Sequence, residues 1–301
     1  MNTRRAQPAT VTIDGCSFRY DAAHPVSLAA PLDFKGLGPA WFPAPPPACE
    51  PLQAGAFNGR VATGASCNCS TIRFTPHCDG THTECVGHLT LEPVDARDRL
   101  PAGILPALLL AVHTEIVGAD GAPSGESTEP APKPGDRVVT RAALEAAWPE
   151  PRHAQGSELP CAPRVLVLRT RTARGALATP GTGQTDADDD TSAAVPPYLS
   201  LPAALWLVAR GIEHLVLDLP SADRNEDEGQ LSAHRAFFGL PAGSTALAEA
   251  TRGHCTITEL ARIPANLGTG FGMLEIQAPA LAGDALPSRP LWHEVLAVLP
   301  A

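Results

Sequence analysis

Lysine is almost absent from this 301-residue chain, which contains only Lys35 and Lys133. Lys133 stands in the run Pro-Ala-Pro-Lys-Pro-Gly, whose composition is typical of a loop. A P-loop NTPase and a Schiff-base enzyme both need a lysine that a packed element holds in place. The scarcity of lysine therefore argues against both of these enzyme classes.

Positive charge in general is also scarce, because 22 Lys and Arg residues stand against 32 Asp and Glu residues, a formal charge of −10. The arginines are scattered among acidic residues and form no basic stripe. Nucleic-acid binding needs a basic face that neutralises phosphates, and an anionic membrane surface attracts the same kind of face. We therefore expect neither nucleic acid nor membrane as a partner.

Long apolar runs are missing as well. The longest, residues 104–112, has about half the length of a membrane-spanning helix and is interrupted by Pro106. The arginines near the N-terminus are not followed by the apolar core of a signal peptide, which predicts a cytoplasmic protein. Eight cysteines in this length are too few for a disulfide scaffold, so we expect reduced thiols or ligands.

The 44% of hydrophobic residues suffices to bury a full core. Strand-like apolar runs occupy residues 164–168, 214–217, 256–260 and 273–277, and helical periodicity occupies residues 141–148, 201–210 and 232–238. Proline and glycine are concentrated at residues 38–51, 118–135 and 175–197, which are predicted loops. The alternation of strands and helices predicts a mixed α/β domain with no clean internal boundary.

Residues 67–88 are the one chemically dense part of the chain, with three histidines, four cysteines and two acidic residues. His82 and Glu84 are two residues apart, so on an extended segment both side chains project from one face. Gly80 would allow a sharp turn that folds His77 back toward that face. Imidazole and carboxylate ligands with open positions are typical of a catalytic zinc, manganese or iron site. His88 need not be a ligand and is placed to carry protons beside such a metal.

The cysteines of this segment offer two alternatives. A structural zinc ion could be held by four thiolates. However, neither Cys67 with Cys69 nor Cys78 with Cys85 has the two-to-four-residue separation of a zinc knuckle. A catalytic thiol partnered by His77 is the second alternative. The cysteines concerned are Cys67, Cys69, Cys78 and Cys85 for the zinc ion, and Cys69 or Cys78 for the thiol.

The segment HCDGTHTECVGH, residues 77–88, resembles the signature HxGTHxDxPxH of the cyclase-like metal hydrolases, a family that includes bacterial kynurenine formamidase and isatin hydrolase. Further resemblances follow in the family's order: a strand that ends in threonine at 164–170, a DxPSxD turn at 218–223, Ala-His-Arg at 233–235, Thr-Glu-Leu at 258–260 and Pro-Ser-Arg at 287–289. The resemblance covers residues 70–292.

The resemblance implies a role for each matching residue. His82 and Glu84 correspond to metal ligands of the signature, and His88 corresponds to its catalytic acid/base. His234 and Glu259 correspond to the ligands that complete the site. The implied cofactor is a divalent metal, one or two ions of zinc or manganese.

Three departures from the signature affect this assignment. His77 is five residues before His82 where the signature has four, so strict register would put Cys78 in the first ligand position. Glu84 replaces the aspartate of the signature, and Val86 replaces its proline. We predict that His77 is nevertheless the ligand.

The resemblance also implies an α/β fold, a barrel-like mixed β-sheet with peripheral helices, in a homo-oligomer that is a dimer or a tetramer. Residues 1–65 would form a proline-rich extension packed on the core, and residues 66–301 the cyclase-like metal hydrolase domain. The implied activity is hydrolysis of a carbon–nitrogen (amide) bond in a small molecule, as an arylformamidase converts N-formylkynurenine to kynurenine and formate. The alternatives are a hydrolase or cyclase acting on a cyclic lactam or lactone, and a non-catalytic metal-binding homologue.

Overall fold

The computed structural model describes residues 8–32, 34–35, 42–119, 126, 130–149, 161–172, 175–176 and 195–299. Its strands are β1 (Pro8–Ile13), β2 (Cys16–Asp21), β3 (Val26–Ser27), β4 (Ala48–Pro51), β5 (Gln53–Ala54), β6 (Phe57–Asn58), β7 (Ser70–Arg73), β8 (His82–Cys85), β9 (Leu105–His113), β10 (Glu115–Ile116), β11 (Arg137–Val139), β12 (Val165–Thr172), β13 (Gly175–Ala176), β14 (Tyr198–Leu199), β15 (His214–Leu217), β16 (Thr256–Glu259), β17 (Gly270–Gln277), β18 (Ala285–Pro287) and β19 (Arg289–Leu299). The α-helices are α1 (Pro76–Asp79), α2 (Arg141–Ala147), α3 (Leu201–Ala209) and α4 (Ser232–Phe238), and short 3₁₀ turns are η1 (Val61–Thr63), η2 (Val86–His88), η3 (Ala96–Asp98) and η4 (Leu247–Glu249).

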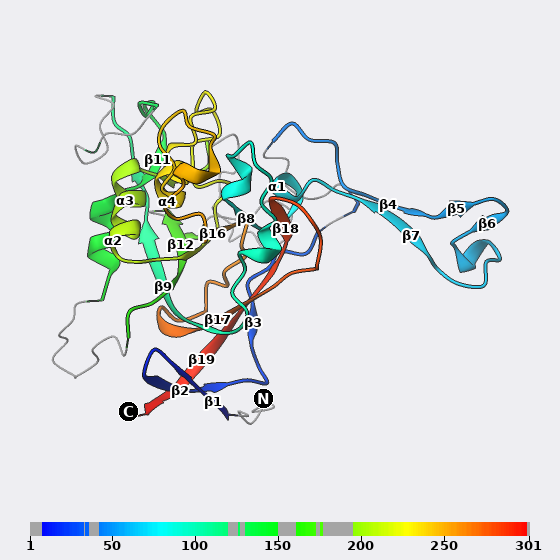
Figure 1. Cartoon of the computed structure of the whole chain (residues 1–301), viewed down its shortest axis with the longest axis horizontal. Coiled ribbons are helices and arrows are strands. Elements are labelled where there is room, and N and C mark those ends of the chain that lie inside the picture. The colour runs from blue at the N-terminus through cyan, green and yellow to red at the C-terminus, as the bar shows by residue number, and fades with distance from the viewer. Residues whose placement is uncertain are drawn as a thin grey trace.

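One large mixed sheet organises the described chain (Figure 1). Its strands follow the order β1-β2-β19-β17-β9-β12-β15-β16-β8-β18, with β3 paired to β19 and β13 paired to β12. The central strands β9, β12, β15 and β16 run parallel to one another, and the flanking pairs are antiparallel. Strands β9 and β12 are apolar on both faces because both faces of this central part are covered.

The sheet curls strongly from β19 round to β18. These two strands are separated by six others in the sheet, yet only Ser288 lies between them in the chain. A flat sheet could not bring its distant strands end to end across one residue. The predicted barrel-like mixed α/β fold is therefore confirmed.

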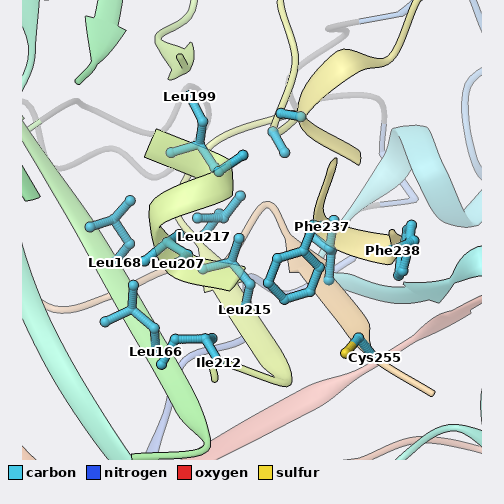
Figure 2. Packing of buried hydrophobic residues seen from close by; sticks show 14 of the residues in the cluster. Leu166, Leu168, Leu199, Leu207, Ile212, Leu215, Leu217, Phe237, Phe238 and Cys255 are labelled. Carbon is cyan, nitrogen blue, oxygen red and sulfur yellow. The ribbon is translucent and has the colours of Figure 1, made fainter. Parts of the chain in front are cut away.

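Helices α2, α3 and α4 cover one face of the parallel strands. Side chains alternate along β12 and β15, so leucines face the helices and valines face the interior of the curl. Figure 2 shows Leu207 of α3 and Phe237 of α4 packed over Leu215 of β15. The opposite face packs against Leu28 and Trp292, so the extension and β19 close the interior.

The strands and helices predicted from periodicity are confirmed with small shifts in their bounds. Predicted elements 214–217 and 232–238 match β15 and α4, and Thr140 caps α2 by accepting a hydrogen bond from the amide of Ala143 at 3.1 Å. The apolar run 104–112 is the central strand β9, with Pro106 at its second residue. Two predicted loops are partly wrong, because residues 48–51 form β4 and residues 175–176 form β13. The rest of the last predicted loop up to residue 194 lies outside the described residues.

The predicted extension contacts the core at β2, which pairs with β19, and along residues 26–32. Strand β3 pairs with β19, Ala29 forms a bridge with Ala261, and the amide of Ala30 donates to Thr81 Oγ1 at 2.9 Å. Farther along, β4 and β7 form a ribbon that extends away from the rest of the molecule and carries the hairpin β5–β6 (Figure 1). The domain boundary at residue 65, inside this ribbon, stays a prediction. Among the described helices, none combines the length and the apolar character needed to cross a bilayer.

Helix α3 offers a direct test of the packing. Leu207 is fully buried against the sheet, whereas Leu205 on the same helix is 50% exposed. We expect Leu207→Ala to lower the free energy of unfolding by about 2–5 kcal/mol, because it leaves a cavity in the core. The matched control Leu205→Ala should change it by no more than about 0.5 kcal/mol. Equal effects in urea denaturation would contradict this packing.

Candidate metal centre

Strand β8 lies between β16 and β18, and all its residues are buried. Its side chains alternate between two faces of the sheet. Thr83 points to one face, where its hydroxyl lies 2.7 Å from Thr258 Oγ1 and donates to Ser288 Oγ at 2.8 Å. His82 and Glu84 project together to the other face, so the predicted extended arrangement of this pair is confirmed.

The extra residue between His77 and His82 is absorbed by α1. This single helical turn carries His77 and directs its Nδ1 to within 3.0 Å of Glu84 Oε2. The predicted sharp turn at Gly80 is wrong, because Gly80 is fully extended with φ 177° and ψ −175°. His77 belongs to the group of potential ligands around Glu84, and Cys78 belongs to none within the described chain.

Helix α4 and strand β16 bring the remaining predicted ligands to Glu84. His234 Nε2 lies 2.7 Å from Glu84 Oε1 and 3.3 Å from Glu259 Oε1. His82 Nε2 lies 3.6 Å from Glu259 Oε2, because Glu259 and His82 are opposite each other in the β16–β8 pair. The five predicted ligands therefore form two groups that share Glu84, one with His77 and His82 and the other with His234 and Glu259, although they come from distant parts of the sequence.

The inner atoms of this cluster lack hydrogen bonds. His82 Nε2, His234 Nε2 and both carboxylate oxygens of Glu84 are buried and have no hydrogen-bond partner in the described structure, despite their short mutual distances. Buried polar atoms without partners are rare and costly, and they indicate a group that binds them. Imidazole nitrogens and carboxylate oxygens are ligands of zinc and manganese, so the residues present fit a divalent metal ion.

The outer nitrogen of each imidazole is held by an acceptor. His82 Nδ1 donates to the carbonyl oxygen of Gly80 at 3.0 Å, and His234 Nδ1 donates to Asp223 Oδ2 at 2.6 Å. His77 Nε2 donates to Asp284 Oδ2 at 2.9 Å. Histidines that bind metals show this pattern, because the outer hydrogen bond fixes the tautomer and the ring orientation.

Sequence reasoning missed the roles of Asp223 and Asp284. Asp223 closes the DxPSxD turn and also accepts from the amides of Ala233 and His234, so it anchors the start of α4. That turn was a usable signal for Asp223. Asp284 directly precedes β18 and has no comparable local signal, because it meets His77 only through the tertiary fold.

The electrostatics of the cluster follow from its buried carboxylates. Burial lowers the pKa of His77, but the hydrogen bond to Asp284 and the adjacent carboxylate of Glu84 outweigh burial and raise it to about 10. Burial also opposes charge on His234, whose pKa is nevertheless raised well above its usual value by Glu84 and Asp223. The cationic imidazole of His234 in turn overcomes burial and holds the pKa of Glu84 well below its usual range. The site therefore favours positive charge at its centre.

His88 lies at the rim of the centre on η2. Its side chain is 29% exposed, and its Nδ1 lies 3.3 Å from Asp284 Oδ2. The ring centroid is 4.2 Å from that of His77 and 5.9 Å from that of His234. His88 is thus outside the Glu84 cluster but close enough to reach a molecule bound there.

The two cysteine alternatives find no support in the described structure. No group of potential ligands among the described residues includes a cysteine, and Cys67 and Cys69 are exposed on the ribbon. Burial and the neighbouring Asp79 raise the pKa of Cys78, which disfavours the thiolate that a nucleophile needs.

The model of the cyclase family, described as "Putative cyclase", matches residues 26–224, which is more than half of the chain. The chain belongs to the cyclase family. His234 and Glu259 lie beyond the matched residues, and their places rest on the geometry above. No curated protein matches the chain in sequence.

Solved structures share the fold. An isatin hydrolase A from Labrenzia aggregata bound to benzyl benzoate has a TM-score of 0.53 at 15% identity, covering 90% of this chain and 94% of that chain. An isatin hydrolase bound to the product analogue thioisatinate has a TM-score of 0.52 at 14% identity, covering 90% of this chain and 92% of that chain. A protein described as a novel cyclase has a TM-score of 0.52 at 18% identity, covering 90% and 87% of the two chains.

The convergence of ligands predicts that His82 is needed for metal binding. We expect His82→Ala to bind much less zinc than the wild type in elemental analysis after dialysis, since the variant lacks an inner nitrogen. His293→Ala is the control, because His293 is also buried, with 4% exposure, but lies on β19 away from the cluster. Unchanged zinc stoichiometry in His82→Ala would refute the assignment.

The raised pKa of His77 predicts that zinc and protons compete. The pKa of His77 is about 10, so at any pH below this the metal-free imidazole carries a proton that zinc must displace. Apparent zinc affinity should therefore rise with pH and fall as the solution becomes acidic. Titration calorimetry at pH 7 in buffers of different ionisation enthalpy should detect proton release. Absence of release would show that the imidazoles are already neutral.

Proposed function

We propose that the chain is a metal-dependent hydrolase of a carbon–nitrogen bond, with an aryl formamide such as N-formylkynurenine as its substrate. One observation carries this proposal: buried imidazole and carboxylate groups converge without hydrogen bonds beneath a rim that holds a separate histidine. Three His ligands and two Glu ligands would form the metal site, and they are His77, His82, Glu84, His234 and Glu259. Glu84 presents one oxygen to His77 and the other to His234, so it would be the ligand shared by both halves of the cluster.

A bound divalent ion supplies Lewis-acid polarisation of the amide carbonyl and lowers the pKa of a coordinated water toward neutrality. The chain itself supplies rigidity, because Gly80, Asp223 and Asp284 hold the outer nitrogens of the imidazoles. Rigid ligands keep the reacting groups in position during the reaction.

His88 is the proposed proton carrier. Amide hydrolysis requires a proton on the departing nitrogen, because a neutral amine leaves far more readily than its anion. His88 is half-buried at the rim, close to His77 and His234, and Nδ1 faces Asp284. Its remaining nitrogen is therefore available to a substrate at the centre.

A second candidate substrate is a cyclic lactam or lactone. The likeness in fold to structures described as isatin hydrolases supports it, because isatin is a cyclic lactam. The same metal site and the same proton carrier serve both reactions, so the choice between them lies in the substrate pocket.

A substrate panel separates these possibilities. We expect hydrolysis of aryl formamides that is lost on chelation and restored by added zinc or manganese. Turnover of isatin-like lactams or lactones instead of formamides would establish the second candidate. Metal binding without turnover of either substrate class would indicate a non-catalytic homologue.

The role of His88 gives a separate prediction. His88→Ala should retain wild-type metal content but lose turnover by about 10²–10⁴-fold, the range for loss of a general acid or base. Metal content and kcat are measured on the same preparation. Loss of the metal together with the side chain would make His88 a ligand and exclude it as the proton carrier.

A further inference from the structure

Asp284 occupies a rigid position beside the metal centre. Its carbonyl oxygen accepts from the amide of Cys85 on β8 at 3.0 Å. The preceding Gly283 donates its amide to Asp95 Oδ1 at 2.9 Å and accepts from the amide of Ala96 at 2.7 Å. The backbone on both sides of the Asp284 side chain is thus tied to β8 and to the start of η3.

One oxygen of this carboxylate meets two imidazoles. Asp284 Oδ2 lies 2.9 Å from His77 Nε2 and 3.3 Å from His88 Nδ1. The two rings are tilted by 31° with centroids 4.2 Å apart, so both can direct an N–H group to the same oxygen. A carboxylate only accepts hydrogen bonds, so both facing nitrogens must carry the hydrogen.

We propose that Asp284 is a positioning residue that couples the metal ligand His77 to the proton carrier His88. The proposal rests on the proposed function for the catalytic part of its claim. Asp284 holds the hydrogen on Nε2 of His77, so the proton that zinc displaces is the one on Nδ1, which faces Glu84. Asp284 also holds the hydrogen on Nδ1 of His88, which leaves Nε2 as the nitrogen that exchanges protons with substrate.

Asp284 could instead be a metal ligand, and this role would give different protonation states of the two histidines. His77, His88 and Asp284 lie close enough to hold an ion of their own. Such an ion would occupy the nitrogens that the coupling requires to be protonated. The two roles therefore predict opposite protonation states for His77 Nε2 and His88 Nδ1.

The test compares Asp284→Ala with Asp284→Asn in the full chain, using zinc alone as the probe. Removal of the acceptor should weaken zinc binding by about 10–100-fold, the usual effect of losing an outer hydrogen bond to a ligand. Asn keeps an acceptor oxygen and should recover part of that loss. The control is Asp98→Ala, because Asp98 is a nearby aspartate whose side chain is 67% exposed and pairs with Arg97.

Nitrogen-15 NMR of the histidine rings provides a readout that does not need turnover. In the zinc-loaded wild type, His77 should carry its hydrogen on Nε2 and His88 on Nδ1, and Asp284→Ala should abolish the preference at His88. Zinc affinity and the histidine tautomers together decide whether Asp284 is a positioning residue. Absence of hydrolysis of every substrate tested would refute the proposed function but would leave this test valid.

Kinetics test the link to His88. At saturating zinc, Asp284→Ala should still lower kcat, and this loss should vanish in a His88→Ala background, since the effect passes through His88. Three results would overturn the proposal: unchanged zinc affinity and tautomers in Asp284→Ala, loss of one whole zinc ion per chain, or kcat losses of Asp284→Ala and His88→Ala that simply add.

Discussion

Two carboxylates buried side by side are the constraint on which this molecule is built. Glu84 and Glu259 are 1% and 4% exposed, and each raises the cost of ionising the other. Only positive charge at the same place offsets that repulsion, and the imidazoles of His77 and His234 supply it in the metal-free chain. Nearly every other feature of the site serves to hold these opposite charges within contact distance while the surrounding core excludes water.

The curl of the sheet makes this concentration of charge possible. Strand β8 lies between β16 and β18, which places His82 opposite Glu259 at the end of β16 and Glu84 beside His234 near the start of α4. A side chain from each neighbouring element then needs only to point inward to reach the centre. Helix α4 supplies His234 to this site, which therefore borders the apolar core beneath α3 and α4: the ring centroid of His234 is 6.4 Å from that of Phe238.

Local sequence signals explain what could be predicted and what could not. The two-residue spacing of His82 and Glu84 and the apolar runs of β12 and β15 can each be recognised within a short stretch of sequence. The Asp14-Gly15 turn between β1 and β2, with φ of 48° and 79°, is also a local hairpin signal. Asp284 is different, because its partner His77 is 207 positions away and no periodicity connects them. Proximity of that kind is a property of the closed sheet alone.

The place of β8 in the sheet also sets an order of events during synthesis. Both of its neighbours, β16 and β18, lie in the last part of the chain, so β8 leaves the ribosome long before either can pair with it. Until then β8 has no neighbouring strand in the sheet. The pairing that completes the centre joins segments far apart in sequence, which makes it a slow step of folding. A divalent ion could therefore meet the complete ligand set only after these last strands have paired.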